Sequence, residues 1–380
     1  MHHRWGLLFS AAVLSVAAAP ARAQDAGVDG GAADAATVEP PAIVEPPPSL
    51  PRADKGDGHA PKVGGYLQVL GVARPDSNDS GESDPTSFRI RRARVSLHGK
   101  IARGLRYEVE AELSKPVSPL RDAFITIEVI PRHRLQIGQQ KSPFGYENNV
   151  GSTKLLVIRR SFVSTELARG PTMRDIGLAL YGDWELPAGL GIEYGVAAVN
   201  GAGQNVVEDD TPGKTYWGRA ALSYAAPNLG FAATLGVSVG WGDRFATAVS
   251  ELDDEDDGSA ISLPYDFNRY GVDVELTGRY ASLVAEYVRG TDFVLVGDVV
   301  RDGWYVLVAG HLPGRFGPIG RWQRYTENVA FPSLKVERWT AGAYWDALPK
   351  GRARLLVNYD FDRSTDRKDD SFNVMAQVVF

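Results

Sequence analysis

Apolar and polar residues alternate along most of the chain between residue 62 and residue 380. In the segment 105–114, for example, Tyr107 and Val109 alternate with Glu108 and Glu110. A period of two residues predicts β-strands, because neighbouring side chains of a strand point to opposite faces. Segments of this kind occupy residues 63–73, 88–101, 105–114, 122–130, 134–141, 176–186, 191–200, 216–225, 230–241, 268–280, 281–293, 303–312, 319–331, 334–348, 352–362 and 371–380. No segment shows a sustained helical period.

The connections between these segments alternate in length. Short turns such as Arg103-Gly104 and Pro227-Asn228 alternate with mostly longer polar connections. The longest of these are 74–87, 142–175, 201–215 and 242–267. An even number of strands with this asymmetry is typical of outer-membrane barrels. A soluble β-sandwich would not need one charged and one continuously apolar face on nearly every strand. We therefore predict an all-β fold, a transmembrane antiparallel β-barrel of about sixteen strands.

The first residues have the composition of a secretory signal peptide. Arg4 supplies a positive charge, residues 6–19 are uncharged and mostly apolar, and residues 21–23 (Ala-Arg-Ala) form a cleavage site flanked by small residues. The apolar stretch is too short to span a bilayer as a helix. We therefore expect residues 1–23 to be a cleaved signal peptide and the mature chain to reach the outer membrane of a Gram-negative bacterium.

Residues 24–61 differ in composition from everything that follows. This region has seven Pro, seven acidic residues, two basic residues and no aromatic residue. Such a composition cannot bury enough apolar surface to offset the entropy of ordering. We expect a Pro-rich, disordered periplasmic spacer, with docking on a periplasmic partner as the alternative, and the barrel domain in residues 62–380.

Aromatic residues and the end of the chain fit a membrane barrel. Trp residues lie near the ends of predicted strands, where they are expected to form interfacial girdles: Trp184, Trp217, Trp241, Trp304 and Trp322. The last strand ends NVMAQVVF, with Phe372, Val374 and Phe380 on one face. This is similar to the C-terminal strand by which bacterial outer-membrane barrels are recognised for assembly.

The connection 142–175 is too long for a hairpin turn. Loops above about 12–15 residues are usually functional or disordered. From residue 141 to residue 174 there are two acidic residues and six basic ones, in a chain of net charge −6: Lys141, Lys154, Arg159, Arg160, Arg169 and Arg174. Clusters of Arg and Lys in a narrow pore favour anions, and the planar guanidinium suits phosphate. The alternative is that these residues pair with carboxylates of the barrel wall and only hold the loop in place.

Two further arginines share one face of the second predicted strand. Arg92 and Arg94 alternate with Ala93 and Val95, so we expect both guanidinium groups to face the lumen. The alternative is an arginine row that pairs with the glutamates of the next strand, since cross-strand pairs of opposite charge are favourable. Those glutamates also weaken the case for a uniformly cationic lumen.

The sequence gives no support for catalysis, metal binding or nucleic-acid binding. The chain has no Cys, which excludes thiol catalysis and Cys-ligated metals. The acidic run 251–257 (ELDDEDD) fails the EF-hand pattern because Pro264 holds the place of the bidentate Glu, so a solvated loop is expected. No Ser/His/Asp spacing and no basic–aromatic interleaving emerges. The sequence predicts no enzyme, no metal, no cofactor and no nucleic-acid partner.

Four segments together resemble the phosphate-selective porin O and P family: FRIRRARVSLHGKI (88–101), LRYEVEAELSK (105–115), LQIGQQKSPFGYEN (135–148) and RDIGLALYGDW (174–184). The resemblance covers residues 62–380. It implies a sixteen-stranded barrel, usually trimeric, whose third external loop folds into the lumen. Selective members line that constriction with Arg and Lys, and many members have no demonstrated selectivity. Residues 142–175 follow the fifth strand, which is the place of that loop.

The resulting hypothesis is a passive outer-membrane diffusion channel that favours anions such as phosphate. The alternatives are a general, weakly selective porin and a non-conducting barrel with a structural or adhesive role. Expected partners are outer-membrane lipid and lipopolysaccharide, small anions and two further copies of the chain. The candidate pore-lining residues are Arg92, Arg94, Lys141, Lys154, Arg159, Arg160, Arg169 and Arg174.

Overall fold

The computed structural model describes residues 60–74, 86–115, 119–128, 130–169, 174–206, 209, 213–245, 264–294, 297–364 and 370–380. The expected signal peptide, the acidic run 251–257 and the expected spacer up to residue 59 lie outside the described residues. Among the residues described, no helix is long and apolar enough to cross a membrane.

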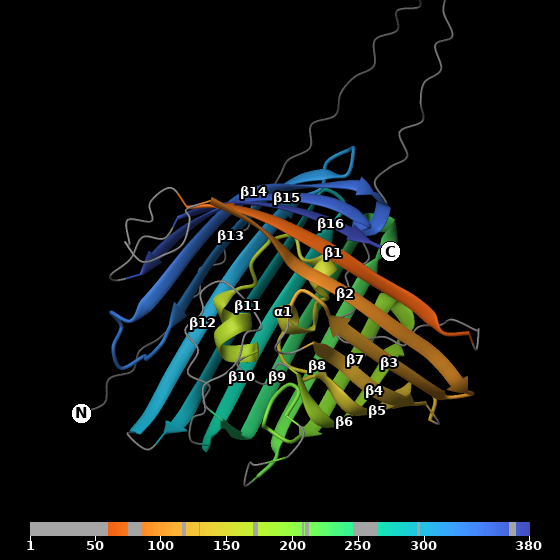
Figure 1. The fold of residues 1–380 in the computed structure, drawn as a ribbon. Helices are drawn as coiled ribbons and strands as arrows, with labels where there is room; N and C mark the ends of the chain where they lie inside the picture. Colours follow the sequence, from red (N-terminus) through yellow and green to blue (C-terminus); the bar gives the residue numbers. More distant parts are fainter. Residues whose placement is uncertain are drawn as a thin grey trace, which may run out of the picture. The chain divides into compact units, whose positions relative to one another are not determined.

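Sixteen antiparallel strands form a closed barrel (Figure 1). They are β1 (Lys62–Ala73), β2 (Thr86–Ala102), β3 (Leu105–Glu112), β4 (Leu120–Ile127), β5 (His133–Lys141), β6 (Arg174–Glu185), β7 (Leu190–Val199), β8 (Thr215–Ala226), β9 (Phe231–Phe245), β10 (Pro264–Gly278), β11 (Ala281–Val294), β12 (Gly297–Gly310), β13 (Phe316–Thr326), β14 (Lys335–Leu348), β15 (Ala353–Ser364) and β16 (Ser371–Val379). Each strand pairs with its neighbours in sequence, and β1 pairs with β16 to close the ring. The predicted barrel and strand number are confirmed.

The two faces of each strand differ in exposure, as the alternation predicts. In β16, Phe372 and Val378 are exposed on the outer face, whereas Ser371 and Asn373 are buried on the inner face. The outer face is apolar because it carries the side chains that meet hydrocarbon, and the polar residues face the interior.

The aromatic residues divide between the two faces. Trp241 and Trp322 are exposed on the outside, as expected for an interfacial girdle. Trp217 is different, and the prediction for it is wrong. It is buried and its ring contacts the rings of Phe144 and Phe267. In β8 the outward position belongs to the neighbouring Tyr216, which stacks on Trp241, so the alternation turns Trp217 inward.

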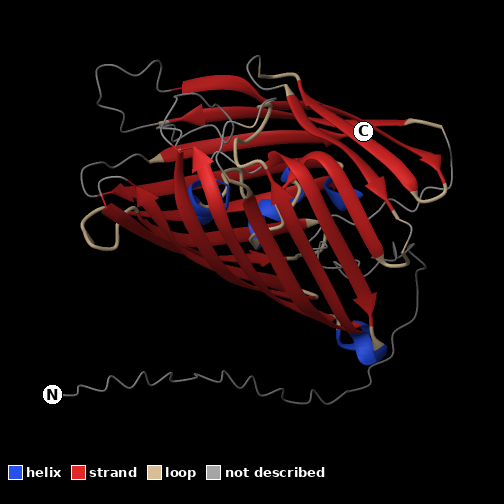
Figure 2. Cartoon of the chain, turned by 90° about the horizontal axis from the view of Figure 1, so that it is seen from below, coloured by secondary structure: helices blue, strands red, loops and turns tan. Residues whose placement is uncertain are grey.

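The connection between β5 and β6 is the largest departure from a plain barrel. Its described part, residues 142–169, is called the internal segment below. It contains the short helix α1 (Tyr146–Asn149), a 3₁₀ turn η1 (Ser152–Lys154) and a π-helix η2 (Val163–Arg169). Figures 1 and 2 show these helices within the ring of strands.

Candidate functional site

Backbone groups of the internal segment bind side chains of distant strands. Gly145 donates its N–H to Ser238 of β9 at 3.0 Å, and Tyr146 donates to Glu286 of β11 at 3.0 Å. Further along, Ile158 donates its N–H to Asn358 of β15 at 2.8 Å. Because the segment leaves the wall at β5 and returns at β6, these bonds fix it against the opposite half of the barrel.

Apolar side chains of the internal segment fill two parts of the interior. Around Phe144, a cluster includes Trp217 and Phe267, and the ring centroids of Phe144 and Trp217 are 5.1 Å apart. Around Ile158, a second cluster includes inward residues of β1, β12 to β16, such as Leu70 and Met375. Inward-facing apolar residues are unusual in a water-filled barrel. Here they serve as the surface on which the segment packs.

Glu147 is the main internal junction of the segment. Its carboxylate is almost fully buried and accepts hydrogen bonds from the backbone N–H (2.7 Å) and the hydroxyl (2.8 Å) of Ser161. The same carboxylate lies 3.6 Å from the guanidinium of Arg321 on β13. Its backbone N–H donates to Glu286, which also accepts from Tyr146. Glu147 therefore ties α1, the turn before η2 and the wall together.

Among the candidate residues of the loop, Arg160 has a structural position. It is buried, and its guanidinium donates to the carbonyl oxygens of Glu147 and Val150 within the segment. Burial is the main cause that lowers the pKa of Arg160; Glu147 opposes this shift, and Arg94 and Arg91 add to it. Arg160 therefore stabilises the fold of the segment and lies near the arginines of β2.

The other loop candidates are spread along the segment. Arg159 is half-buried, with its guanidinium 3.8 Å from Asp362 of β15. Burial is the largest cause that lowers the pKa of Arg159 to about 10, so this guanidinium stays charged at neutral pH. Lys154 is exposed, and Lys141 donates to the carbonyl oxygen of Asn148 at 3.2 Å. Arg169 ends η2, and its side chain lies outside the described residues.

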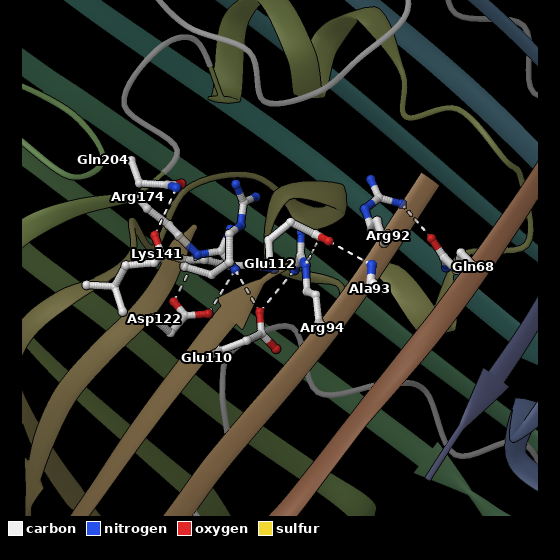
Figure 3. Close-up of polar contacts among 12 residues, drawn as sticks. Gln68, Arg92, Ala93, Arg94, Glu110, Glu112, Asp122, Lys141, Arg174 and Gln204 are labelled. Atoms are coloured by element: carbon white, nitrogen blue, oxygen red, sulfur yellow. Dashed lines mark hydrogen bonds and ion pairs between the residues drawn. The ribbon is translucent and has the colours of Figure 1, made fainter. Parts of the chain in front are cut away.

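The candidates on β2 have their guanidinium groups inside the barrel (Figure 3). Arg92 donates to Gln68 of β1 at 2.9 Å. Arg94 binds Glu112 at 2.8 Å and Glu110 at 3.0 Å, both on β3. The alternative in which the arginine row pairs with the glutamate row is therefore confirmed for Arg94.

A β-bulge in β2 brings in arginines that simple alternation places elsewhere. The register with β1 shifts between Gln68 and Val69, and Arg91 is the extra residue. Arg91 and Arg92 are both buried as a result, and Arg91 reaches the sulfur of Met375 on β16. An extra residue in a bulge reverses the alternation beyond it. Arg89, Arg91, Arg92 and Arg94 thus all lie on the inner face.

A second ion-pair centre lies beside the first. Arg174, the first residue of β6, binds Asp122 of β4 through both ends of its guanidinium, at 3.0 and 2.8 Å. The same guanidinium lies 3.8 Å from Glu110, so Glu110 connects Arg174 and Arg94. Lys141 is the cross-strand partner of Arg174. Figure 3 shows these groups converging from neighbouring strands: Arg94 of β2, Glu110 of β3, Asp122 of β4, Lys141 of β5 and Arg174 of β6.

Sequence reasoning missed several inward-facing arginines on the remaining wall. Each one has a carboxylate within reach: Arg219 with Asp273, Arg269 with Asp292, Arg321 with Glu147, and Arg338 with Asp362. All four sit at the inward positions of alternating strands, which is a signal that the sequence contains. The partners could not be chosen from it, because only those of Arg269 and Arg338 lie on an adjacent strand, whereas that of Arg219 is two strands away and that of Arg321 is on the internal segment. The described interior is therefore rich in both signs of charge.

Comparison with known proteins agrees with this architecture. Residues 63–250 match the family model described as phosphate-selective porin O and P. No curated protein sequence matches the chain.

Solved structures share the fold at low sequence identity. The anion-selective porin of Comamonas acidovorans aligns with a TM-score of 0.59 at 14% identity, covering 84% of this chain and 99% of that one. OmpT of Vibrio cholerae lacking loop L8 aligns with a TM-score of 0.58 at 13% identity, covering 84% of this chain and 99% of that one. The outer-membrane channel DcaP of Acinetobacter baumannii aligns with a TM-score of 0.54 at 13% identity, covering 87% of this chain and 100% of that one. Over residues 63–250 the chain matches the phosphate-selective porin O and P family, and its closed sixteen-stranded barrel is that of an outer-membrane channel.

Proposed function

We propose that the protein is a passive diffusion channel that favours anions such as phosphate. The observation that carries the proposal is the bulge in β2, which places four arginines on one inner wall: Arg89, Arg91, Arg92 and Arg94. Guanidinium groups stay charged at any physiological pH and bind two oxygens of a phosphate at once. In a narrow pore with low-dielectric walls, such a row raises the local concentration of anions.

We propose further that the internal segment is the third external loop and narrows the lumen. Its hydrogen bonds to β9, β11 and β15 support this role, because they hold it across the interior. Transport requires no bond to be made. An anion exchanges part of its hydration for the donors of the wall and leaves because each contact is weak.

The proposal extends to processing, assembly and surroundings. Residues 1–23 are removed on export, residues 24–61 form a periplasmic spacer, and residues 62–380 form the barrel in contact with lipid and lipopolysaccharide. The active form is a homotrimer. A structurally similar porin, OmpT of Vibrio cholerae, is described in a trimer form, which supports this assembly.

A general, weakly selective pore is the second candidate. The ion pairs of the wall favour it, because Arg94, Arg174, Arg219 and Arg338 each contact a carboxylate. Balanced charges cancel much of the field that acts on a passing ion. A non-conducting barrel is the third reading, and it predicts no current steps.

Reversal potential in a planar bilayer separates these functions. The purified protein is inserted under a salt gradient, first with chloride and then with phosphate as the anion. An anion-selective potential is expected. The combined change Arg91→Gln and Arg92→Gln should move it toward cations, whereas Arg279→Gln, at an exposed turn, should leave it unchanged. A cation-selective wild type would refute the proposal, and an absence of current steps would support the non-conducting barrel.

The variants on β2 are preferable to changes in Arg159 and Arg160. Replacing both loop arginines with Glu is expected to lower anion preference. However, Arg160 also holds two carbonyl groups of the internal segment. A changed potential in that variant would combine a lost charge with a displaced segment.

A further inference from the structure

The inner wall is covered unevenly by the internal segment. Inward-facing residues of β8 to β14 are nearly all buried; they include Trp217, Arg219, Phe267, Arg269, Tyr305, Gln323 and Arg338. In the turn-side half of β2, β3 and β4, most inward-facing residues are only half-buried, with Thr126 as a buried exception; the half-buried ones are Ser96, His98, Arg106, Glu108, Glu110 and Phe124. The two apolar clusters explain the difference, since they hold the segment against β1, β6 to β8 and β10 to β16. Solvent therefore reaches the interior mainly along β2 to β4.

Most charges on this solvated wall are paired. Glu112 binds Arg94, Asp122 binds Arg174, and Glu110 is within 4 Å of both guanidinium groups. The charged groups that cluster here include the carboxylates of Glu108, Glu110, Glu112 and Asp122 and the cations of Arg94, Lys141 and Arg174. Three of these four carboxylates have a guanidinium within 4 Å.

Glu108 is the carboxylate left over. Within the described chain it makes no hydrogen bond or ion pair, and the charges around it are of both signs: the carboxylates of Asp122 and Glu110 and the cations of Arg174 and Lys141. Its cross-strand partners are His98 on β2 and Phe124 on β4, neither of which is a fixed cation. When ionised, a carboxylate without a direct ion pair acts more strongly on a passing ion than the paired carboxylates beside it.

The position of Glu108 along the wall gives it a defined role. The short turns lie at one end of the barrel and the long connections at the other. Along β2 from the end with the long connections, the inward residues are first Arg89, Arg91, Arg92 and Arg94. His98 follows nearer the turn end, and Glu108 lies directly opposite it on β3. An anion that has passed the arginines therefore meets Glu108 before it reaches the turn end.

We propose that Glu108 is a specificity-determining residue that limits the preference of the channel for anions. The ions follow the wall of β2 to β4, and the carboxylate of Glu108 repels anions and attracts cations after the arginine row. This inference rests on the proposed channel function. A unit charge about 10 Å from an ion in water changes its relative permeation by roughly twofold, and by more in a less polar setting.

The test measures reversal potential for the wild type, Glu108→Gln and the control Glu185→Gln, whose carboxylate is exposed at the end of β6. Glu108→Gln should raise the ratio of anion to cation permeability by about twofold to fivefold, and Glu108→Lys should raise it further. Glu185→Gln should match the wild type. These shifts are read relative to the wild type, so they test Glu108 whichever ion the wild type prefers.

Single cysteines provide an independent measurement, because the natural chain contains none. In Glu108→Cys, a water-soluble, negatively charged methanethiosulfonate should react and lower the anion current, whereas a positively charged one should raise it. Val109→Cys, on the opposite face of the same strand and exposed outward, should give no change in current. Unchanged reversal potential in Glu108→Gln, or an unreactive Glu108→Cys in a conducting barrel, would overturn the assignment.

Discussion

Replacing Glu147 with Ala should release the internal segment without unfolding the barrel. The substitution removes the acceptor of two hydrogen bonds from Ser161, at 2.7 and 2.8 Å, and the carboxylate 3.6 Å from Arg321. The barrel itself is held by sixteen strand pairings that do not involve residue 147. The effect should therefore appear in the pore and not in the sheet.

The size of the effect follows from burial. Hydrogen bonds to a charged group contribute about 1.5–3 kcal/mol each, and removing one partner of a buried ion pair costs about 3–5 kcal/mol. These contributions overlap, because Glu147 serves both partners at once and Arg321 also donates to the carbonyl oxygen of Arg159. We expect a loss of about 3–5 kcal/mol in the docking of the segment. The apolar clusters around Phe144 and Ile158 oppose full release.

Single-channel recording measures this prediction. Glu147→Ala should show a larger mean conductance and more open-channel noise than the wild type, as the segment exchanges between docked and undocked positions. Glu147→Gln should be intermediate, because its amide oxygen can still accept from Ser161 while the charge facing Arg321 is gone. Glu166→Ala is the matched control, since Glu166 carries the same charge in the same segment but is exposed.

The reasoning fails if Glu147→Ala and Glu166→Ala give equal conductance and noise in barrels that remain folded. Folding is checked independently by the change in electrophoretic mobility on heating. A folded barrel with wild-type currents would mean that the apolar clusters alone hold the segment.

Three other substitutions test the packing of the interior and the wall. Arg94→Ala should lower the free energy of unfolding in urea by about 3–5 kcal/mol, because it leaves the buried Glu112 without its guanidinium. The double variant with Glu112→Ala should lose less, because it leaves no buried carboxylate uncompensated; an equal or larger loss would contradict this cause. Trp217→Ala should lower the free energy of unfolding by about 3–5 kcal/mol, because it opens a cavity between Phe144 and Phe267. Thermal unfolding measures this loss, and Trp241→Ala on the outer face should give a smaller one. Gly138→Ala should lower the yield of assembled barrel, because φ is +136° and the new Cβ would lie 2.2 Å from the carbonyl oxygen of Ala123; Gly320→Ala, which meets no atom within 4 Å, should assemble normally.

The strands could be predicted because their signal is local. Alternation located all sixteen, and most boundaries agree to within a few residues. The larger errors occur where charge interrupts the pattern. β12 begins at Gly297 instead of residue 303, since Asp298, Arg301 and Asp302 hide the alternation at its start. β13 ends at Thr326, although apolar residues continue to Phe331.

The site could be predicted only in part because its decisive contacts are not local. The sequence placed Arg92 and Arg94 inside, but the inward turn of Arg91 depends on a register shift against β1. Ile90 and Ala93, the apolar residues on either side of the two arginines, are three positions apart instead of two. This irregular spacing indicates the bulge. The bonds of Glu286 to α1 join residues about 140 positions apart, and no local pattern indicates such a pair.

The closure of β1 on β16 has a consequence for the order of assembly. The last residue, Phe380, exchanges two backbone hydrogen bonds with Gly65. The internal segment, in turn, is held by Asn358 and by Gln377, which bind residues 200 and 224 positions earlier in the chain. Contacts of such long sequence separation form late in folding. The internal segment can therefore dock fully only after β15 and β16 have joined the sheet. Its docking then indicates that the barrel has closed. A chain that ends at Asp370 should leave residues 142–169 open to protease, whereas the full chain should protect them.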